Sequence, residues 1–171
     1  LNGKKIVETK DGIKFNLEYI DAHVFSETFV SNMHRMKIVD DFRDKIVIDI
    51  GANYGDTALY YANLGAKVYA IEMDNKIFDG MIVNLSLNSE LKSNIEPINL
   101  TIGDENTIRK IVDKYQIKEI ELLKMDCKGC EFNLVKEDLT NVNKVKIEYT
   151  TSVNNPNNDH HMENLINLLF S

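Results

Sequence analysis

A loop with two glycines, between an apolar run and a predicted helix, carries the strongest chemical signal in the sequence. This stretch, 49–55 (DIGANYG), closes the apolar run 45–50. Its glycines let the backbone turn tightly and bring amides close to a ligand, and the helix start behind them offers unpaired N–H groups. Glu72 ends the next apolar run, where a carboxylate can accept hydrogen bonds from both hydroxyls of a ribose. The loop and the acid together predict a ligand that contains a nucleoside.

The spacing of the glycines separates two classes of nucleoside ligand. Dinucleotide sites favour G-x-G-x-x-G, but Asn53 stands here at the position of the second glycine, and Gly51 and Gly55 form G-x-x-x-G. This pattern suits a ligand without a phosphate, whose amino-acid carboxylate lies at the helix start while Asp49 orders the loop or faces the amino group. We therefore expect S-adenosylmethionine as the cofactor, with S-adenosylhomocysteine as its product. A nucleotide-dependent oxidoreductase is the disfavoured alternative.

Strand-like and helical segments alternate around this loop. We expect strands at 45–50, 67–72, 95–100, 120–125 and 145–150. Helices are expected at 56–65, 77–85, 108–115 and 131–137, and a terminal helix carries Leu165, Ile166, Leu168 and Leu169. Strands separated by helices require a parallel sheet with right-handed crossovers. The predicted class is a doubly wound, mostly parallel α/β sheet of about five strands, in which ligands bind outside the carboxyl ends of the strands.

The N-terminal part is expected to add a hairpin and a helix to this core. Residues 4–9 and 13–19 flank a Lys-Asp-Gly turn signal, which predicts a β-hairpin. A helix with one apolar face should follow, from the spacing of Phe25, Phe29, Met33 and Met36. We expect a single domain over 1–171, made of this segment (1–44) and the Rossmann-like core (45–171). The strand 145–150 alternates apolar and polar residues, which indicates a partly uncovered face near the sheet edge.

Composition and charge exclude several function classes. The chain has 171 residues, and 20 Lys and Arg against 27 Asp and Glu give a formal charge of −7. A basic field for nucleic acid is therefore absent, and an anionic membrane would repel the protein on average. No apolar run approaches the roughly 18 residues that a membrane span needs, and the N-terminus lacks a signal-peptide core. We expect a cytoplasmic protein. Because the chain begins at Leu1, it could also be a processed, trimmed or excised fragment.

Five segments resemble one known family when they are taken in order. They are VIDIGANYGDT (47–57), AIE (70–72), the N-x-x-L-N segment NLSLN (84–88), LLKMDCKGCE (122–131) and Glu148 in KIEYT. This set resembles the FkbM-type methyltransferases of the class I S-adenosylmethionine-dependent group, over about 45–150. The resemblance implies a Rossmann-like transferase that methylates a hydroxyl of a sugar or another small metabolite.

The resemblance also implies which residues form the site. Asp126, at the end of the fourth strand, should lie beside the methionine end of the cofactor, and Glu131 and Glu148 should converge on the same mouth as catalytic carboxylates. Carboxylates so placed could raise one another's pKa to give a base, or could hold a divalent cation. No metal is expected, because Lys128 stands where the family usually has Glu. The cofactor-binding residues implied are Asp49, Gly51, Ala52, Asn53, Tyr54, Gly55, Thr57, Glu72, Met73, Thr101, Ile102 and Asp126, with Thr101 and Ile102 bordering the adenine.

Two departures from the family pattern keep a second hypothesis open. One is Lys128, and the other is the absence of sequence for the terminal antiparallel strand pair of the class I fold. Both motivate a non-catalytic S-adenosylmethionine-binding module or subunit that needs a partner. The expected partner otherwise is a small-molecule or glycan acceptor, whose identity the sequence does not name, nor does it name the oligomeric state.

Cysteine and histidine residues give weaker signals. Cys127-x-x-Cys130 between a strand and a helix could be a redox motif, but a pair of small, partly buried thiols is the favoured interpretation. His23 and His34 are expected at the surface, and His160-His161 in an exposed loop.

Overall fold

A five-stranded parallel sheet forms the centre of the protein. The structure, a computed structural model, describes residues 5–31, 33–34, 41–103, 107–149 and 158–170. The strands are β3 (Ile46–Ile50), β4 (Lys67–Glu72), β5 (Ile95–Asn99), β6 (Leu122–Met125) and β7 (Val145–Ile147). Their order in space is β5-β4-β3-β6-β7, and every pairing is parallel. The chain thus builds one half of the sheet outward from β3 and then crosses to β6, which places the topological switch point between β3 and β6.

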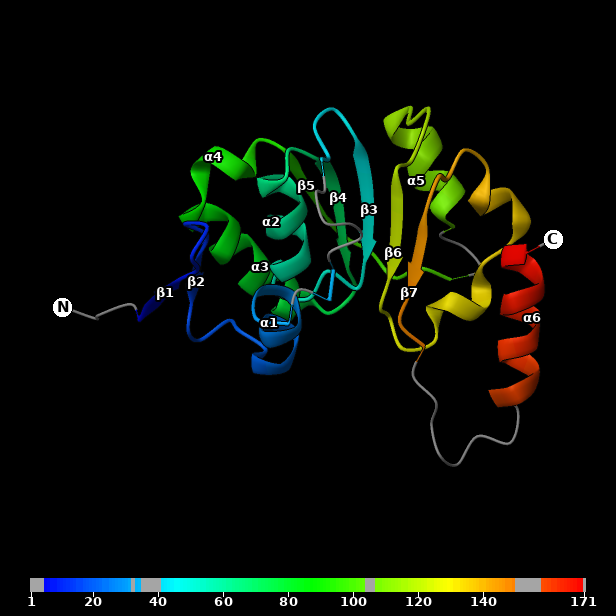
Figure 1. The fold of residues 1–171 in the computed structure, drawn as a ribbon, viewed down its shortest axis with the longest axis horizontal. Coiled ribbons are helices and arrows are strands. Elements are labelled where there is room, and N and C mark those ends of the chain that lie inside the picture. Colours follow the sequence, from blue (N-terminus) through cyan, green and yellow to red (C-terminus); the bar gives the residue numbers. More distant parts are fainter. Residues whose placement is uncertain (1–4, 32, 35–40, 104–106, 150–157, 171) are drawn as a thin grey trace.

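Helices cover both faces of this sheet (Figure 1). On one face, Val47, Val68 and Leu122 pack against α2 (Asp56–Asn63) and α3 (Asn75–Leu87), with α4 (Ser89–Lys92) beside them. On the other, Ile48, Tyr69 and Leu123 pack against α5 (Ile108–Tyr115). Successive strand residues thus enter two different cores, as the period of two in a strand requires. This explains why the inner strands are apolar on both faces.

The edge strand β7 and the segments after it complete the second face. Two short 3₁₀ helices, η1 (Cys130–Asn133) and η2 (Lys136–Leu139), follow β6, and α6 (Asn158–Phe170) packs against η1. The expected α-helix at 131–137 was therefore wrong in type. The prediction that the half-polar strand at 145–150 lies at the sheet edge is confirmed. Within the described ranges, no strand follows β7, and no helix is long and apolar enough to cross a membrane.

The predicted N-terminal hairpin is present, as β1 (Ile6–Glu8) paired antiparallel with β2 (Lys14–Asn16). Helix α1 (Ala22–Phe29) follows and begins at Asp21, whose carboxylate accepts from the amides of His23 and Val24. Met33 lies beyond the end of this helix and is 54% exposed, so its expected place on the apolar face was wrong. Met36 falls outside the described residues.

Two buried asparagines, Asn84 in α3 and Asn88 at its C-terminal cap, fasten the hairpin to the core. The amide group of Asn88 accepts from the Lys14 amide at 2.9 Å and donates to the Lys14 carbonyl at 2.7 Å. Asn84 accepts from the Asn16 amide at 2.9 Å and donates to the carbonyls of Tyr19 (2.8 Å) and Tyr54 (2.9 Å). The segment 84–88 therefore links the hairpin, the entry to α1 and the glycine loop, which gives the N-x-x-L-N pattern a structural role.

Candidate functional site

A cavity of about 250 Å³ lies at the carboxyl ends of the central strands, at the switch point of the sheet. Three groups of residues line it. The ends of β3 and β4, the loops after them and the first turn of α3 contribute Ile50, Gly51, Asn53, Ile71, Glu72, Met73 and Ile77. The segments that follow β5, β6 and β7 contribute Leu100, Ile102, Asp126, Cys127, Lys128, Cys130 and Glu148. Helix α1 and its capping residue contribute Asp21, His23, Val24 and Glu27.

Gly51 lets the end of β3 lie directly against the end of β6. Its φ is 75°, and a Cβ on it would lie 2.0 Å from the Asp126 carbonyl oxygen. The Asp126 amide donates to the Ile50 carbonyl at 2.9 Å, which holds the two segments together. A residue with a side chain would therefore force the two strand ends apart.

Bare amides were expected to face the ligand from this loop, and for three of its residues this was wrong. The amides of Gly51 and Ala52 both donate to the Ile71 carbonyl at 2.9 Å. The Asn53 amide donates to the Glu72 carboxylate at 3.0 Å. These bonds extend the β3–β4 pairing past the end of β3, so these three amides are already paired within the protein.

Glu72 lies where the sequence predicts the acid that holds a ribose. Its side chain is 8% exposed and lines the cavity. One carboxylate oxygen accepts from the Asn53 amide at 3.0 Å and the other from the Asp74 amide at 2.9 Å. Each oxygen keeps a further lone pair, because a carboxylate oxygen can accept two hydrogen bonds. The two amides therefore fix the carboxylate and leave it able to accept from two hydroxyls.

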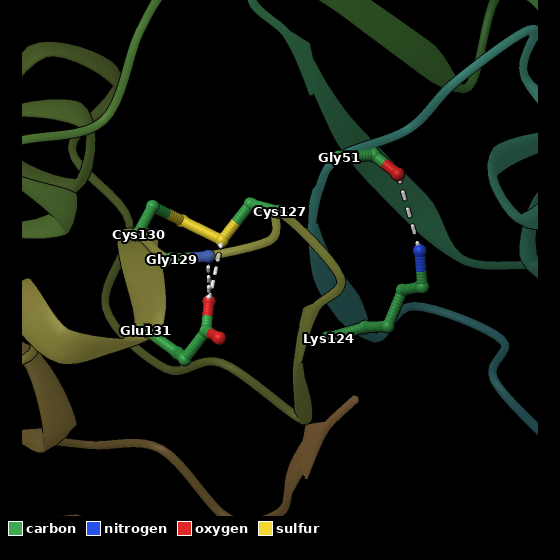
Figure 2. Close-up of a disulfide and its surroundings, with 6 residues drawn as sticks. All are labelled: Gly51, Lys124, Cys127, Gly129, Cys130 and Glu131. Atoms are coloured by element: carbon green, nitrogen blue, oxygen red, sulfur yellow. Dashed lines mark hydrogen bonds between the residues drawn. A yellow bond between two sulfur atoms is a disulfide. The ribbon is translucent and has the colours of Figure 1, made fainter. Parts of the chain in front are cut away.

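Asp49 stands behind the loop and not in the cavity. It is fully buried, its carboxylate lies 3.0 Å from the Lys124 ammonium, and it accepts from the Thr57 hydroxyl. Lys124 also donates to the Gly51 carbonyl at 3.3 Å (Figure 2). Of the two roles expected for Asp49, the structure supports ordering of the loop. Thr57 shares this internal position, and neither residue is among those that line the cavity.

Other predicted cofactor contacts also lie away from the cavity lining. Ala52 is buried, and Gly55 begins α2 with a φ of 90°. The ring of Tyr54 lies against the backbone at Gly80, where a Cβ would meet it at 2.7 Å. Thr101 is exposed and does not line the cavity, whereas the neighbouring Ile102 does. The predicted residues that the structure brings together around the cavity are Gly51, Asn53, Glu72, Met73, Ile102 and Asp126.

Two of the three predicted catalytic carboxylates meet at the mouth of the cavity. Asp126 and Glu148 both line it, and the Glu148 amide donates to the Met125 carbonyl at 2.8 Å, which places the two carboxylates at the ends of adjacent strands. Partial burial, helped by the nearby charges of Asp126 and Glu27, raises the pKa of Glu148. This shift strengthens Glu148 as a proton acceptor near neutral pH.

Glu131 does not join that pair, and its expected place at the mouth was wrong. Its side chain is 1% exposed and does not line the cavity. Its carboxylate accepts from the Gly129 amide at 2.7 Å, because the 127–130 turn folds over it (Figure 2).

The two cysteines form a disulfide, which corrects the expected pair of thiols. Their Cα atoms lie 5.5 Å apart, and the turn between them has φ values of 53° at Lys128 and 131° at Gly129. Cys127, Cys130 and Glu131 are the one group in the described part of the chain whose side chains could together hold a metal ion. While the sulfurs are bonded to each other, they cannot serve as thiolate ligands.

The residues of α1 that line the cavity were not predicted from the sequence. His23 and Glu27 lie one helical turn apart, with 3.3 Å between their side chains, and both border the cavity. The charged i, i+4 pair next to a capping Asp21 was the available signal. His34 was expected at the surface but is buried, with its Nδ1 3.0 Å from the Lys146 ammonium, and burial lowers its pKa to about 4.

Comparison with known proteins establishes the fold. No family model and no curated protein matches the sequence. The chain is similar to precorrin 8W decarboxylase from Methanobacterium thermoautotrophicum (TM-score 0.60, 12% identity, 96% of this chain and 81% of that one). It is also similar to precorrin-6y C5,15-methyltransferase from Geobacter metallireducens (0.54, 12%, 88% and 74%), and to Trm5b from Pyrococcus abyssi (0.59, 18%, 96% and 47%). The fold is thus the Rossmann-like α/β fold found among methyltransferases, with an antiparallel hairpin added at the N-terminus.

Proposed function

We propose that the protein is an S-adenosylmethionine-dependent methyltransferase. The observation that carries this proposal is the carboxylate of Glu72, oriented by two backbone amides at the lip of a cavity at the switch point of the sheet. The similarity to a solved precorrin methyltransferase supports it at the level of the fold.

The residues around the cavity fit the parts of this cofactor. Glu72 would accept hydrogen bonds from the ribose hydroxyls. Apolar side chains on both sides of it, Met73, Ile77, Leu100 and Ile102, would cover the adenine. Asn53 has a buried side-chain oxygen without a hydrogen-bond partner, next to the predicted position of the amino-acid tail, and would accept from its amino group.

The acceptor would enter from the side of α1, between Glu27 and Glu148. When bound, S-adenosylmethionine supplies an electrophilic methyl group. The protein has to hold the acceptor in line with that group, and Asp126 and Glu148 would take the proton that a hydroxyl loses. We further propose O-methylation of a sugar or small-metabolite hydroxyl, as expected of an FkbM-type enzyme.

Binding of S-adenosylhomocysteine and of its 2′,3′-dideoxy analogue, measured by calorimetry, tests the cofactor assignment. Each hydrogen bond to a charged group contributes about 1.5–3 kcal/mol, so the loss of both hydroxyls should weaken binding by about a hundredfold or more. In Glu72→Ala the two ligands should bind with nearly equal affinity, because no side-chain partner for the hydroxyls is left at this position. The exposed Glu90→Ala serves as the matched control. Equal binding of both ligands to the unchanged protein, or tighter binding of NAD, would refute the assignment.

A non-catalytic cofactor-binding module is the second candidate, and Lys128 favours it. This cation lines the mouth beside Asp126, where the family usually has a carboxylate. Transfer of labelled methyl groups to any member of a panel of glycans and small alcohols, by the chain alone, would exclude this candidate. Saturable cofactor binding without any transfer would support it.

A further inference from the structure

The Cys127–Cys130 disulfide forms part of the cavity wall. Both residues line the cavity and are partly exposed, which places the bridge beside the crevice. The bridge closes a ring of neighbouring residues, with a sequence separation of 3. Such a short loop restricts the unfolded chain least, so stabilisation of the fold is a weak explanation for it.

A buried carboxylate lies beneath the bridge. The Glu131 Oε2 atom lies 3.5 Å from the Cys127 sulfur, and Oε1 is buried without a hydrogen-bond partner (Figure 2). A disulfide sulfur carries no hydrogen, so this contact becomes a hydrogen bond only when Cys127 is a thiol. Oε2 already accepts from the Gly129 amide, and reduction would give this buried carboxylate a second donor, the Cys127 thiol, where a buried charge is costly without donors. The surroundings therefore favour the reduced pair.

An exposed cation stands between the two cysteines. Lys128 lines the same cavity, and its φ of 53° belongs to the turn that the bridge closes. An ammonium group at this point raises the local concentration of anions, including anionic thiols. The site thus combines a partly exposed disulfide, a hydrogen-bond acceptor and a cation.

We propose that Cys127–Cys130 is a reversible exchange site for small anionic thiols of the glutathione class. A thiolate attacks the Cys130 sulfur, the bond between the two protein sulfurs breaks, and its electron pair stays on Cys127. Cys127 takes a proton from solvent and donates it in a hydrogen bond to Glu131. A second thiolate then attacks the sulfur of the small thiol bound to Cys130. The bond to Cys130 breaks, its electron pair stays on the Cys130 sulfur, and Cys130 takes a proton from solvent, so two small thiols are oxidised to one disulfide while the protein pair is reduced. Oxidation of the pair runs the same steps backwards, with the small disulfide as the oxidant.

The state of this pair should control the wall that carries Asp126. The Asp126 carbonyl occupies the space beside Gly51, and its amide donates to the Ile50 carbonyl, so the start of the 126–130 segment and the glycine loop are packed together as one unit. Reduction releases the turn at residues 128–129 and should loosen that unit. Any effect on cofactor affinity rests on the proposed function, but the exchange and the loosening do not.

Mass spectrometry of the folded protein in glutathione redox buffers tests the exchange. We expect both thiols to appear without denaturant, and Cys127→Ser to trap glutathione on Cys130. Hydrogen exchange of residues 126–131 should be several-fold faster in the reduced form. A disulfide that is reduced only after unfolding, an untrapped Cys127→Ser variant, or equal hydrogen exchange in both forms would overturn the proposal. All three measurements stand even if no nucleoside binds.

Two variants test the assigned neighbours. Lys128→Gln should slow reduction by glutathione several-fold but leave reduction by neutral 2-mercaptoethanol unchanged. If the substitution changed both rates by the same factor, or changed neither, the role of the cation would be contradicted. Glu131→Gln should make the pair harder to reduce and change the pH profile of the exchange. An unchanged profile would contradict the role of the carboxylate.

Discussion

Replacement of Gly51 by alanine tests how the cavity wall is built. The new Cβ would lie 2.0 Å from the Asp126 carbonyl oxygen and 2.7 Å from its carbon, at a φ of 75°. The left-handed backbone conformation costs about 1–2 kcal/mol for a residue with a side chain, and overpacking costs about 1–3 kcal/mol more. We therefore expect Gly51→Ala to lower the free energy of unfolding by about 2–5 kcal/mol.

Two other glycines separate these costs in the same urea-unfolding assay. Gly12 has a similar φ of 81°, but its nearest atom would lie 3.9 Å away, so Gly12→Ala should lose only about 1–2 kcal/mol. Gly103 has open space around it and no left-handed φ, so Gly103→Ala should change stability by about 0.5 kcal/mol or less. If Gly51→Ala cost no more than Gly12→Ala, the close approach of the two strand ends would be refuted.

Four further predictions concern buried polar groups. Lys124→Met leaves the Asp49 carboxylate buried without its cation, so it should lower the free energy of unfolding in urea by about 3–5 kcal/mol. Adding Asp49→Asn should restore part of this loss, and a loss below about 1 kcal/mol for Lys124→Met alone would contradict the buried pair. Asn84→Ala removes the bonds to the hairpin and the glycine loop, so hydrogen exchange over residues 14–19 should rise while that of β6 stays constant. The pKa of His34 is about 4 in the folded protein against 6.5 in the unfolded chain, so the folded state disfavours the protonated ring. About 3 kcal/mol of the free energy of unfolding is therefore lost as pH falls from about 6.5 to about 4, and His34→Asn should remove that dependence. Burial raises the pKa of Asp56 to about 7, which lowers stability as pH rises from about 4 to 7; Asp56→Asn should therefore stabilise the protein more at pH 8 than at pH 5, and equal gains at both pH values would contradict its burial.

The order and type of the main elements could be predicted because each carries a strong periodic pattern. The prediction matched β4 at both ends and β3 to within one residue. The α-helix predicted at 131–137 was wrong because this segment is too short for hydrophobic periodicity to distinguish an α-helix from 3₁₀ helices. The predicted place of Met33 on the apolar face of α1 was wrong because the helix ends before this residue, and spacing alone does not mark the end of a helix.

The site could be predicted where backbone position alone decides it. Glu72 and Asp126 end strands, so the parallel sheet brings them to one edge. Asp49 could not be placed in the same way, because its burial depends on a partner 75 residues away, Lys124. The loop amides were misjudged because the Ile71 carbonyl that accepts from them belongs to another strand.

The contribution of α1 was missed for a similar reason. His23 and Glu27 reach the cavity only because the hairpin is fastened to α3 through Asn84 and Asn88. Such long-range docking leaves no local periodicity in the sequence. The disulfide likewise depends on left-handed φ values at Lys128 and Gly129, and only the glycine signals such a turn.

A crystal structure of the protein grown with S-adenosylhomocysteine is the most direct test of the central claim. We predict the nucleoside in the cavity beside Gly51, with both ribose hydroxyls within hydrogen-bonding distance of the Glu72 carboxylate. A nucleoside bound elsewhere, or a ribose that makes no contact with Glu72, would contradict it.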